Sequence, residues 1–192
     1  MGWQSEEFGA FHDGRAAAVL RDGSEPKPMC FDMGSGSDFH ETDEWWVYDG
    51  TLGAPRAAAL RGACSCGWRG TPTHPLDWSR IDRRRAYDHD TSGPERDWEG
   101  HIEEVEAQTV PLPSPLQELL DQLEQQLGTL AGQAPLAALK AVAALERTTG
   151  HIAREAAHDA QADQPSWEAV GRALGLPAED ARARLAHYIR RG

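Results

Sequence analysis

A proline-rich stretch at residues 109–116, TVPLPSPL, separates two parts of this chain that differ in character. Its three prolines lack backbone N–H groups and disfavour helix at the residues before them, so the stretch is typical of a linker. Residues 44–110 are rich in strand and turn residues, whereas residues 111–192 contain long helical patterns. We therefore expect an α+β protein in which a small antiparallel β module precedes an all-α helical domain.

The first residues of the chain, 1–43, are rich in Gly, Asp, Glu, Ser and Pro. They show neither the period of a helix nor the alternation of a strand. This composition predicts an irregular, partly disordered region ahead of the β module.

Two short strands are predicted next. EWWVYDG (44–50) combines aromatic and β-branched residues, TLGAPR (51–56) supplies turn residues, and AAALRGACS (57–65) suits a returning strand. An antiparallel element of this size is only marginally stable alone, so other parts of the module must support it.

A long irregular connection at residues 71–94 leads to a predicted helix at 95–108. In that helix, Trp98, Ile102 and Val105 share one face and acidic residues occupy the other. A structureless connection of such length usually has a function or is clamped. We expect the helix to close the β module.

The stretch CSCGW contains two cysteines separated by one residue, Cys64 and Cys66. Thiolates are good zinc ligands, and Gly67 permits the sharp turn that would bring both thiols to one ion. A tetrahedral site needs two further ligands. His101 is favoured because it lies one helical turn beyond Trp98, and His74, which would clamp the irregular connection, is expected as the fourth ligand. The remaining candidates are Cys30, His40 and His89.

Other interpretations of these cysteines remain open. The two residues can simply alternate along a strand, with one thiol buried and His101 lying on the helix face. A redox role is typical of two residues between the thiols, and a catalytic zinc would need a nearby general base. The chain also lacks a phosphate-binding glycine loop, a dinucleotide fingerprint and a Gly-x-Ser-x-Gly elbow. We therefore expect a structural zinc site and no enzymatic activity.

The residues after the linker predict two long helices. Leucines recur at spacings of three and four from Leu116 to Leu130, which gives an apolar stripe along one face. Gly132 is expected to end this helix, and Pro135 to begin an Ala-rich helix that runs towards Asp159. Packing of the two as an antiparallel hairpin is the first expectation, and homodimerisation through the leucine stripe is the alternative.

The C-terminal stretch SWEAVGRALGLPAEDARARLAHYIRRG predicts two shorter helices over residues 166–190. Ser166 can cap the first helix, Gly175 can end it in the left-handed conformation, and Pro177 can begin the second. Gly171 and Ala181 are small where the two helices would cross. This pattern fits a helix-turn-helix.

The same stretch resembles the helix-turn-helix of many actinobacterial regulators and of the promoter-reading region 4 of sigma-factor-like proteins. A Cys-x-Cys-Gly-Trp turn followed by such a unit also resembles small actinobacterial regulatory proteins. The resemblance implies that the second helix binds double-stranded DNA. It places Ala178, Glu179 and Arg182 towards the major groove, and Arg172, Arg184, Arg190 and Arg191 near phosphates.

The charge distribution limits any DNA contact to the C-terminal end. The net charge is -12, and only residues 166–192 contain more basic than acidic residues. Glu179 and Asp180 suit the start of a helix, but DNA phosphates repel them. We therefore expect a transcription-associated DNA-binding regulator, with one alternative. That alternative is an adaptor that binds another protein, such as the transcription machinery, through its acidic module or its helices.

Two further features bear on the compartment. The chain shows neither an apolar run that could span a bilayer nor the basic and apolar segments of a signal peptide. Its three cysteines form an odd set, which in a reducing compartment is more often used for metal than for disulfides. We expect a cytoplasmic protein with no membrane partner.

Overall fold

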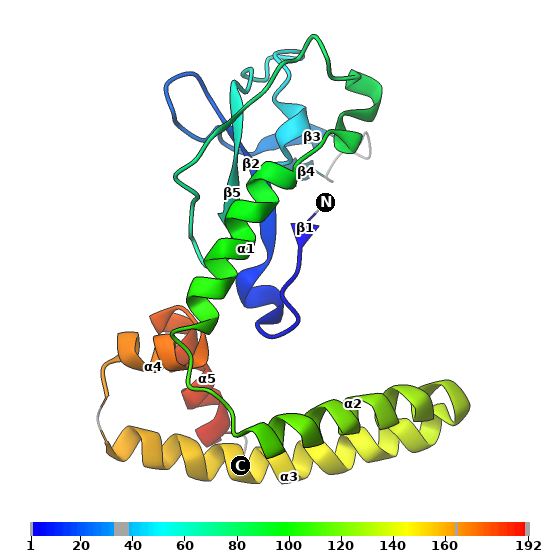
Figure 1. The fold of residues 1–192 in the computed structure, drawn as a ribbon, viewed down its shortest axis with the longest axis vertical. Coiled ribbons are helices and arrows are strands. Elements are labelled where there is room, and N and C mark those ends of the chain that lie inside the picture. The colour runs from blue at the N-terminus through cyan, green and yellow to red at the C-terminus, as the bar shows by residue number, and fades with distance from the viewer. Residues whose placement is uncertain (1, 33–38, 164, 191–192) are drawn as a thin grey trace. The chain divides into compact units, whose positions relative to one another are not determined.

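The structure is a computed structural model that describes residues 2–32, 39–163 and 165–190 (Figure 1). The chain divides into two compact units, Met1–Ala107 and Gln108–Gly192. The first unit contains the β-structure and one long helix, and the second is helical.

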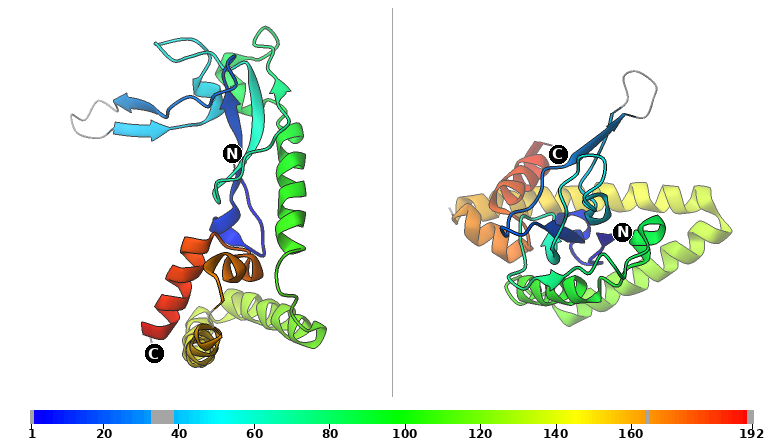
Figure 2. Two further views of the ribbon diagram at one scale, coloured as in Figure 1. Left: turned by 90° about the vertical axis from the view of Figure 1, so that its left-hand side faces the viewer. Right: turned by 90° about the horizontal axis from the view of Figure 1, so that it is seen from above.

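An antiparallel four-stranded sheet forms the centre of the first unit, with the strand order β1-β2-β5-β6. These strands are Gly2–Trp3 (β1), Gly14–Val19 (β2), Ala59–Cys64 (β5) and His74–Pro75 (β6). The central pair runs from Gly14 opposite Cys64 to Val19 opposite Ala59. A separate two-stranded sheet joins β3 (Met29–Asp32) to β4 (Phe39–Thr42) (Figure 2). The predicted antiparallel β module is present, and β5 confirms the strand predicted at 57–65.

The prediction of an irregular region at residues 1–43 is wrong where β2 forms. The residues from Ala16 to Val19 are all buried, so both faces of this strand are covered, because successive side chains point to opposite faces. A strand buried on both sides has a continuous apolar run instead of an alternating pattern. The missing alternation in RAAAV therefore concealed a central strand of the sheet.

The strand predicted at residues 44–50 is a short 3₁₀ helix instead, η2 (Trp45–Val47). Trp45 and Tyr48 are only 2% and 1% exposed and belong to one hydrophobic core with Trp78 and Leu60. A 3₁₀ turn places residues three apart on the same side, whereas a strand would send them to opposite faces. Burial of both rings in one cluster therefore favours the helical turn.

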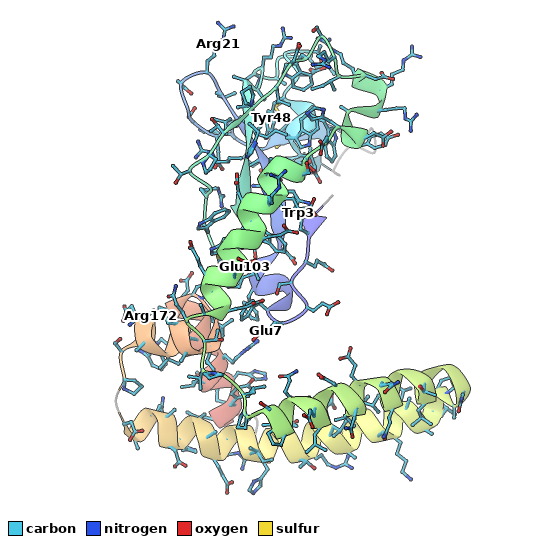
Figure 3. The ribbon with its side chains drawn as sticks, viewed as in Figure 1. Trp3, Glu7, Arg21, Tyr48, Glu103 and Arg172 are labelled. Atoms are coloured by element: carbon cyan, nitrogen blue, oxygen red, sulfur yellow. The ribbon has the colours of Figure 1, made fainter. Side chains whose placement is uncertain are left out.

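The predicted closing helix is present as α1 (Ser92–Glu106), which packs on β2 and β5 (Figure 1). Its Trp98 and Ile102 are buried. Trp3 of β1, labelled in Figure 3, lies against Trp98, and their ring centroids are 5.8 Å apart. A Cβ atom on Gly14 would lie 2.5 Å from the Trp98 ring, and one on Gly62 would lie 2.6 Å from the Pro94 carbonyl oxygen. Glycine on both central strands therefore permits the close approach of α1 to the sheet.

Two further 3₁₀ helices complete the first unit. One, η1 (Gly9–His12), precedes β2, and the other, η3 (Arg83–Asp88), lies within the connection from β6 to α1. The stretch 71–94, predicted to be an irregular connection, therefore contains β6, η3 and the start of α1, and is only partly irregular.

The second unit begins with two long helices, α2 (Ser114–Gln133) and α3 (Pro135–Ala162), which lie side by side as the predicted hairpin (Figures 1 and 2). Gly132, expected to end the first helix, lies inside it. The chain reverses at Ala134, which has an extended φ of -147°, and Pro135 then begins α3 as predicted. Along the described residues, no helix has both the length and the apolar composition needed to cross a membrane.

The last two helices, α4 (Trp167–Leu174) and α5 (Ala178–Arg190), form a helix-turn-helix arrangement. The Ser166 hydroxyl accepts a hydrogen bond from the Ala169 N–H, and Gly175 ends α4 in the left-handed conformation, with φ 63°. The Leu176 N–H donates to the Gly171 carbonyl at 2.8 Å. Gly171 and Ala181, the small residues expected at the crossing, are buried, and so is Leu185. Leu174 is 41% exposed.

Candidate metal centre

Four side chains of the first unit converge on one point. They are His12, Cys64, Cys66 and His101, and their ligand atoms all lie within 4.8 Å of one another. His12 ends η1, Cys64 ends β5, Cys66 lies in the turn that follows, and His101 lies in α1. The cluster therefore joins three segments that are far apart in the sequence.

The turn after β5 brings the two thiols to the same place. The Gly67 N–H donates to the Cys64 carbonyl at 3.0 Å, and the Cys64 N–H donates to the Trp68 carbonyl at 3.0 Å. Gly67 has a φ of 97°, which a side chain rarely adopts, so glycine is needed to close this turn. The Trp68 N–H also points at the Cys66 sulfur, 3.5 Å away. The alternation of the two thiols along a continuing strand is thereby excluded, because β5 ends at Cys64.

Two sulfur–nitrogen distances within the cluster match those of a tetrahedral metal site. The Cys64 Sγ lies 3.5 Å from the His12 Nδ1, and the Cys66 Sγ lies 3.4 Å from the His101 Nε2. Metal–sulfur bonds of about 2.3 Å and metal–nitrogen bonds of about 2.0–2.1 Å at the tetrahedral angle require sulfur–nitrogen separations of about 3.6 Å. The side chains therefore need little movement to bind a metal ion.

His12 is the ligand that sequence reasoning missed. Its ring is 3% exposed and lies between Phe8 and His101, with ring centroids 5.2 and 5.5 Å away. Ser65 fixes the loop beside it, because the Ser65 hydroxyl accepts from the Asp13 N–H at 2.9 Å and donates to the Ala10 carbonyl at 3.0 Å. The pairing of β2 with β5 therefore brings His12 to the cysteine turn. The irregular structure predicted for residues 1–43 contained no such pairing, so His12 was not considered as a ligand.

His74, predicted as the fourth ligand, lies elsewhere. Its Nε2 pairs with the Asp97 Oδ2 at 2.7 Å, and its ring lies against the backbone of Gly93. This pair links β6 to α1, so His74 does clamp the connection, but through a carboxylate and not through a metal. Of the other candidates, His89 lies against the Trp45 ring and Cys30 is exposed, while the side chain of His40 is outside the described part of the structure.

His101 is held by an aromatic ring as well as by the helix. The Trp68 and His101 rings are stacked, with centroids 4.5 Å apart and an interplanar angle of 7°. Trp68 is also part of the hydrophobic cluster of Phe8, Trp98 and Ile102. The CSCGW turn thus supplies both a thiol ligand and the ring that orients an imidazole ligand.

The two thiols titrate as a pair. A hydrogen bond from the Cys66 thiol lowers the pKa of Cys64 to about 3. The same hydrogen bond, together with burial, raises the pKa of Cys66 above its usual range. One thiolate is therefore available before any metal arrives, and binding through both sulfurs would release the second proton.

The residues predicted to contact DNA lie on α4 and α5. Glu179, Arg182 and Arg190 are exposed on α5. Arg172 is exposed on α4 and donates to the Glu168 carbonyl at 3.4 Å (Figure 3). Arg184 is half-buried, and so is Ala178, which packs near Gly171 at the start of α5. Arg191 lies outside the described residues.

Comparison of the chain with family models, with curated proteins and with solved structures found no match. The four-residue cluster is therefore assigned from its geometry in this chain alone.

Proposed function

We propose that His12, Cys64, Cys66 and His101 bind one zinc ion whose role is structural. Two thiolates and two imidazoles are a donor set typical of zinc, and their charges balance those of a divalent ion in a buried place. Four protein ligands fill a tetrahedral shell, so no position remains for water or a substrate. This arrangement supports a site that stabilises the fold and has no catalytic role.

The sheet of the first unit supports a stabilising role for the metal. The buried residues of β2 are Gly14, three alanines and Val19, and such small residues bury little apolar area. A metal that ties η1, the CSCGW turn and α1 together would supply stability that such a core lacks. Free thiols persist in a reducing compartment, so we also place the protein in the cytoplasm.

We propose that the α4–α5 unit binds double-stranded DNA and that the protein is a transcription-associated regulator. The observation that carries this proposal is the tight junction between the helices. A Cβ on Gly171 would lie 2.5 Å from the Leu176 carbonyl oxygen, so glycine allows α5 to cross α4 closely. The face of α5 away from Ala181 and Leu185 presents Arg182 and Arg190, as a recognition helix would.

A protein-binding adaptor is the second candidate. Glu179 is exposed in the first turn of α5, three residues before Arg182, and Asp180 follows it. Two acids at this place favour a basic protein surface over phosphates. The net charge of -12 favours the same kind of partner.

Selection from a random pool of duplex DNA with the full-length, zinc-loaded protein at low salt tests the first candidate. Arg182→Ala should weaken binding to the selected sequence by about 1–3 kcal/mol. Arg190→Ala should weaken binding to all sequences alike. It should also reduce the steepness of the plot of log binding constant against log salt concentration by about one, the effect of losing one phosphate contact. Arg21→Ala, which removes the same charge from an exposed site in the first unit, is the control.

Two outcomes would contradict DNA binding. The first is no retention of DNA at low salt by micromolar folded protein. The second is equal binding by the parent, Arg182→Ala and Arg190→Ala. A protein partner that is retained by Arg182→Ala, with no DNA bound by the parent, would establish the adaptor instead.

A further inference from the structure

The α2–α3 hairpin leaves an unusual amount of apolar surface in contact with solvent. All of α2 is described, and no residue of it is buried. Leu119 is 60% exposed on α2, and Leu136 and Leu139 are 82% and 64% exposed on α3. α3 also contacts α5, but these leucines remain exposed. An apolar surface of this kind favours a partner.

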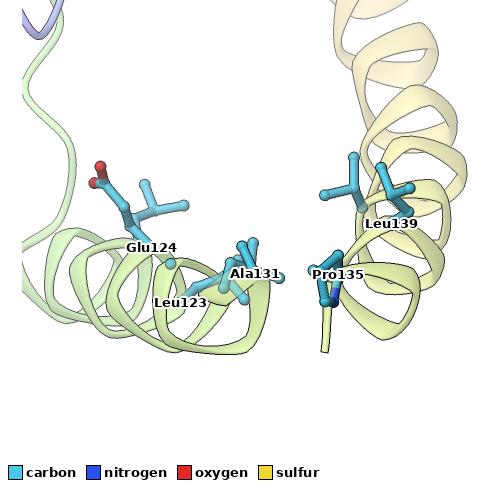
Figure 4. A pocket seen from close by; sticks show the side chains of 10 residues that line it. Leu123, Glu124, Ala131, Pro135 and Leu139 are labelled. Carbon is cyan, nitrogen blue, oxygen red and sulfur yellow. The ribbon is translucent and has the colours of Figure 1, made fainter. Parts of the chain in front are cut away.

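Part of this surface forms a groove of about 770 Å³ between the two helices (Figure 4). The groove is apolar, and its main lining side chains are Leu120, Leu123 and Leu127 from α2 and Leu139 and Val142 from α3. Glu124 is the one charged residue in its lining. Side chains at spacings of three and four on both helices give the ridges and grooves into which another helix packs.

We propose that the α2–α3 hairpin of a second copy of this chain covers the groove, which gives a four-helix bundle with two-fold symmetry. In such a symmetric dimer, α2 of each copy lies against α3 of the other. The proposal rests on the hairpin alone and is independent of zinc binding and of DNA binding.

The charges of the hairpin favour this crossed arrangement. α2 contains Glu118, Asp121 and Glu124 and no Lys or Arg. The first three turns of α3, from Pro135 to Leu145, contain Lys140 and no acidic residue. Pairing α2 with α2 would bring like charges together, whereas pairing α2 with α3 of the other copy brings opposite charges together.

The size of the hairpin is sufficient for a stable dimer. α2 has 20 residues and α3 has 28. A 20-residue helix is about 30 Å long and about 10 Å wide, so two such helices side by side present a face of roughly 600 Å². Specific, stable interfaces bury about 1,200–2,000 Å² in total, or about 600–1,000 Å² on each partner, so this face reaches the lower end of that range.

Sedimentation of the full-length, zinc-loaded protein over a range of micromolar concentrations tests the dimer. We expect a dimer for the parent and, for Leu139→Glu, dimerisation weakened by on the order of 100-fold. Leu139 is already exposed, so helix content by circular dichroism should not change. Leu52→Glu, a change at a 91% exposed leucine of the first unit, should sediment as the parent does. A parent that is monomeric throughout, with the groove left to another occupant, would overturn the proposal.

A charge-reversal experiment tests the crossed arrangement. Glu124→Lys and Lys140→Glu should each weaken homodimers, because each places like charges across both halves of the interface. A mixture of the two variants should form heterodimers in preference to either homodimer, most strongly at low salt. Dimers without this preference would overturn the pairing of α2 with α3.

Discussion

The two units of this protein handle their apolar residues in opposite ways. In the first unit Trp45, Tyr48 and Leu60 are almost fully buried, although the elements that bury them are short and come from distant parts of the sequence. In the second unit the helices are long and regular, but many of their leucines stay exposed. The first unit is therefore stabilised by whatever ties its distant segments together, and we propose that a zinc ion does so. The second unit is stabilised by whatever buries its exposed leucines, and we propose that a second copy of the chain does so.

Removal of the metal should produce the largest difference between the units. Cys66→Ser, or chelation of the parent, should unfold most of residues 1–107. In small zinc-dependent modules, zinc binding contributes on the order of 10 kcal/mol to the free energy of folding. The helices of residues 108–192 should persist. Six of the seven tryptophans lie in the first unit, so tryptophan fluorescence reports on it, and hydrogen exchange separates the two units. Loss of structure in both units together would contradict this separation.

Gly62→Ala should destabilise the first unit alone, by about 1–3 kcal/mol. The added methyl group would meet the Pro94 carbonyl oxygen, and backbone in a helix cannot move aside easily. Thermal unfolding followed by tryptophan fluorescence measures the effect. Gly128→Ala on α2, where no atom lies within 4 Å of the added carbon, is the control and should leave the first unit unchanged.

Trp68→Ala should weaken zinc binding by about 10–100-fold, the range found when partners of metal ligands are removed. The loss follows from the missing stack on His101, and Trp68→Phe should restore part of the affinity because a flat ring remains. Competition with a chromophoric chelator measures the affinity. Unchanged affinity in Trp68→Ala would show that α1 alone orients the imidazole.

His74→Ala should have the smallest effect, about 0.2–1 kcal/mol, because the His74–Asp97 pair is partly exposed and solvent screens it. The variant should keep its zinc, since His74 lies outside the cluster. Asp97→Asn should resemble it in unfolding experiments. Loss of zinc from His74→Ala would show that His74 is a metal ligand and would contradict the four-residue site.

The sequence revealed local features more readily than distant ones. Ser166, Gly175 and Pro177 mark the ends of α4 and the start of α5 by their own conformational preferences, and the structure agrees. Cys64, Cys66 and His101 could be grouped because thiols in a tight turn and a histidine on the following helix have recognisable chemistry.

His12 could not be found in the same way. Its position depends on the pairing of β2 with β5, which places Gly14 opposite Cys64. The run RAAAV is too short and too uniform to distinguish a buried strand from a loop by periodicity. His74 was chosen because it is near in sequence, but β6 and the Asp97 carboxylate hold it away from the thiols.

The most direct test of this account is the zinc content of purified full-length protein and of one variant, His12→Ala. The four-residue site predicts one equivalent of zinc per chain in the parent and its loss, or a large fall in affinity, in His12→Ala. A parent that folds without metal, or a His12→Ala variant that binds zinc as tightly as the parent does, would contradict the site.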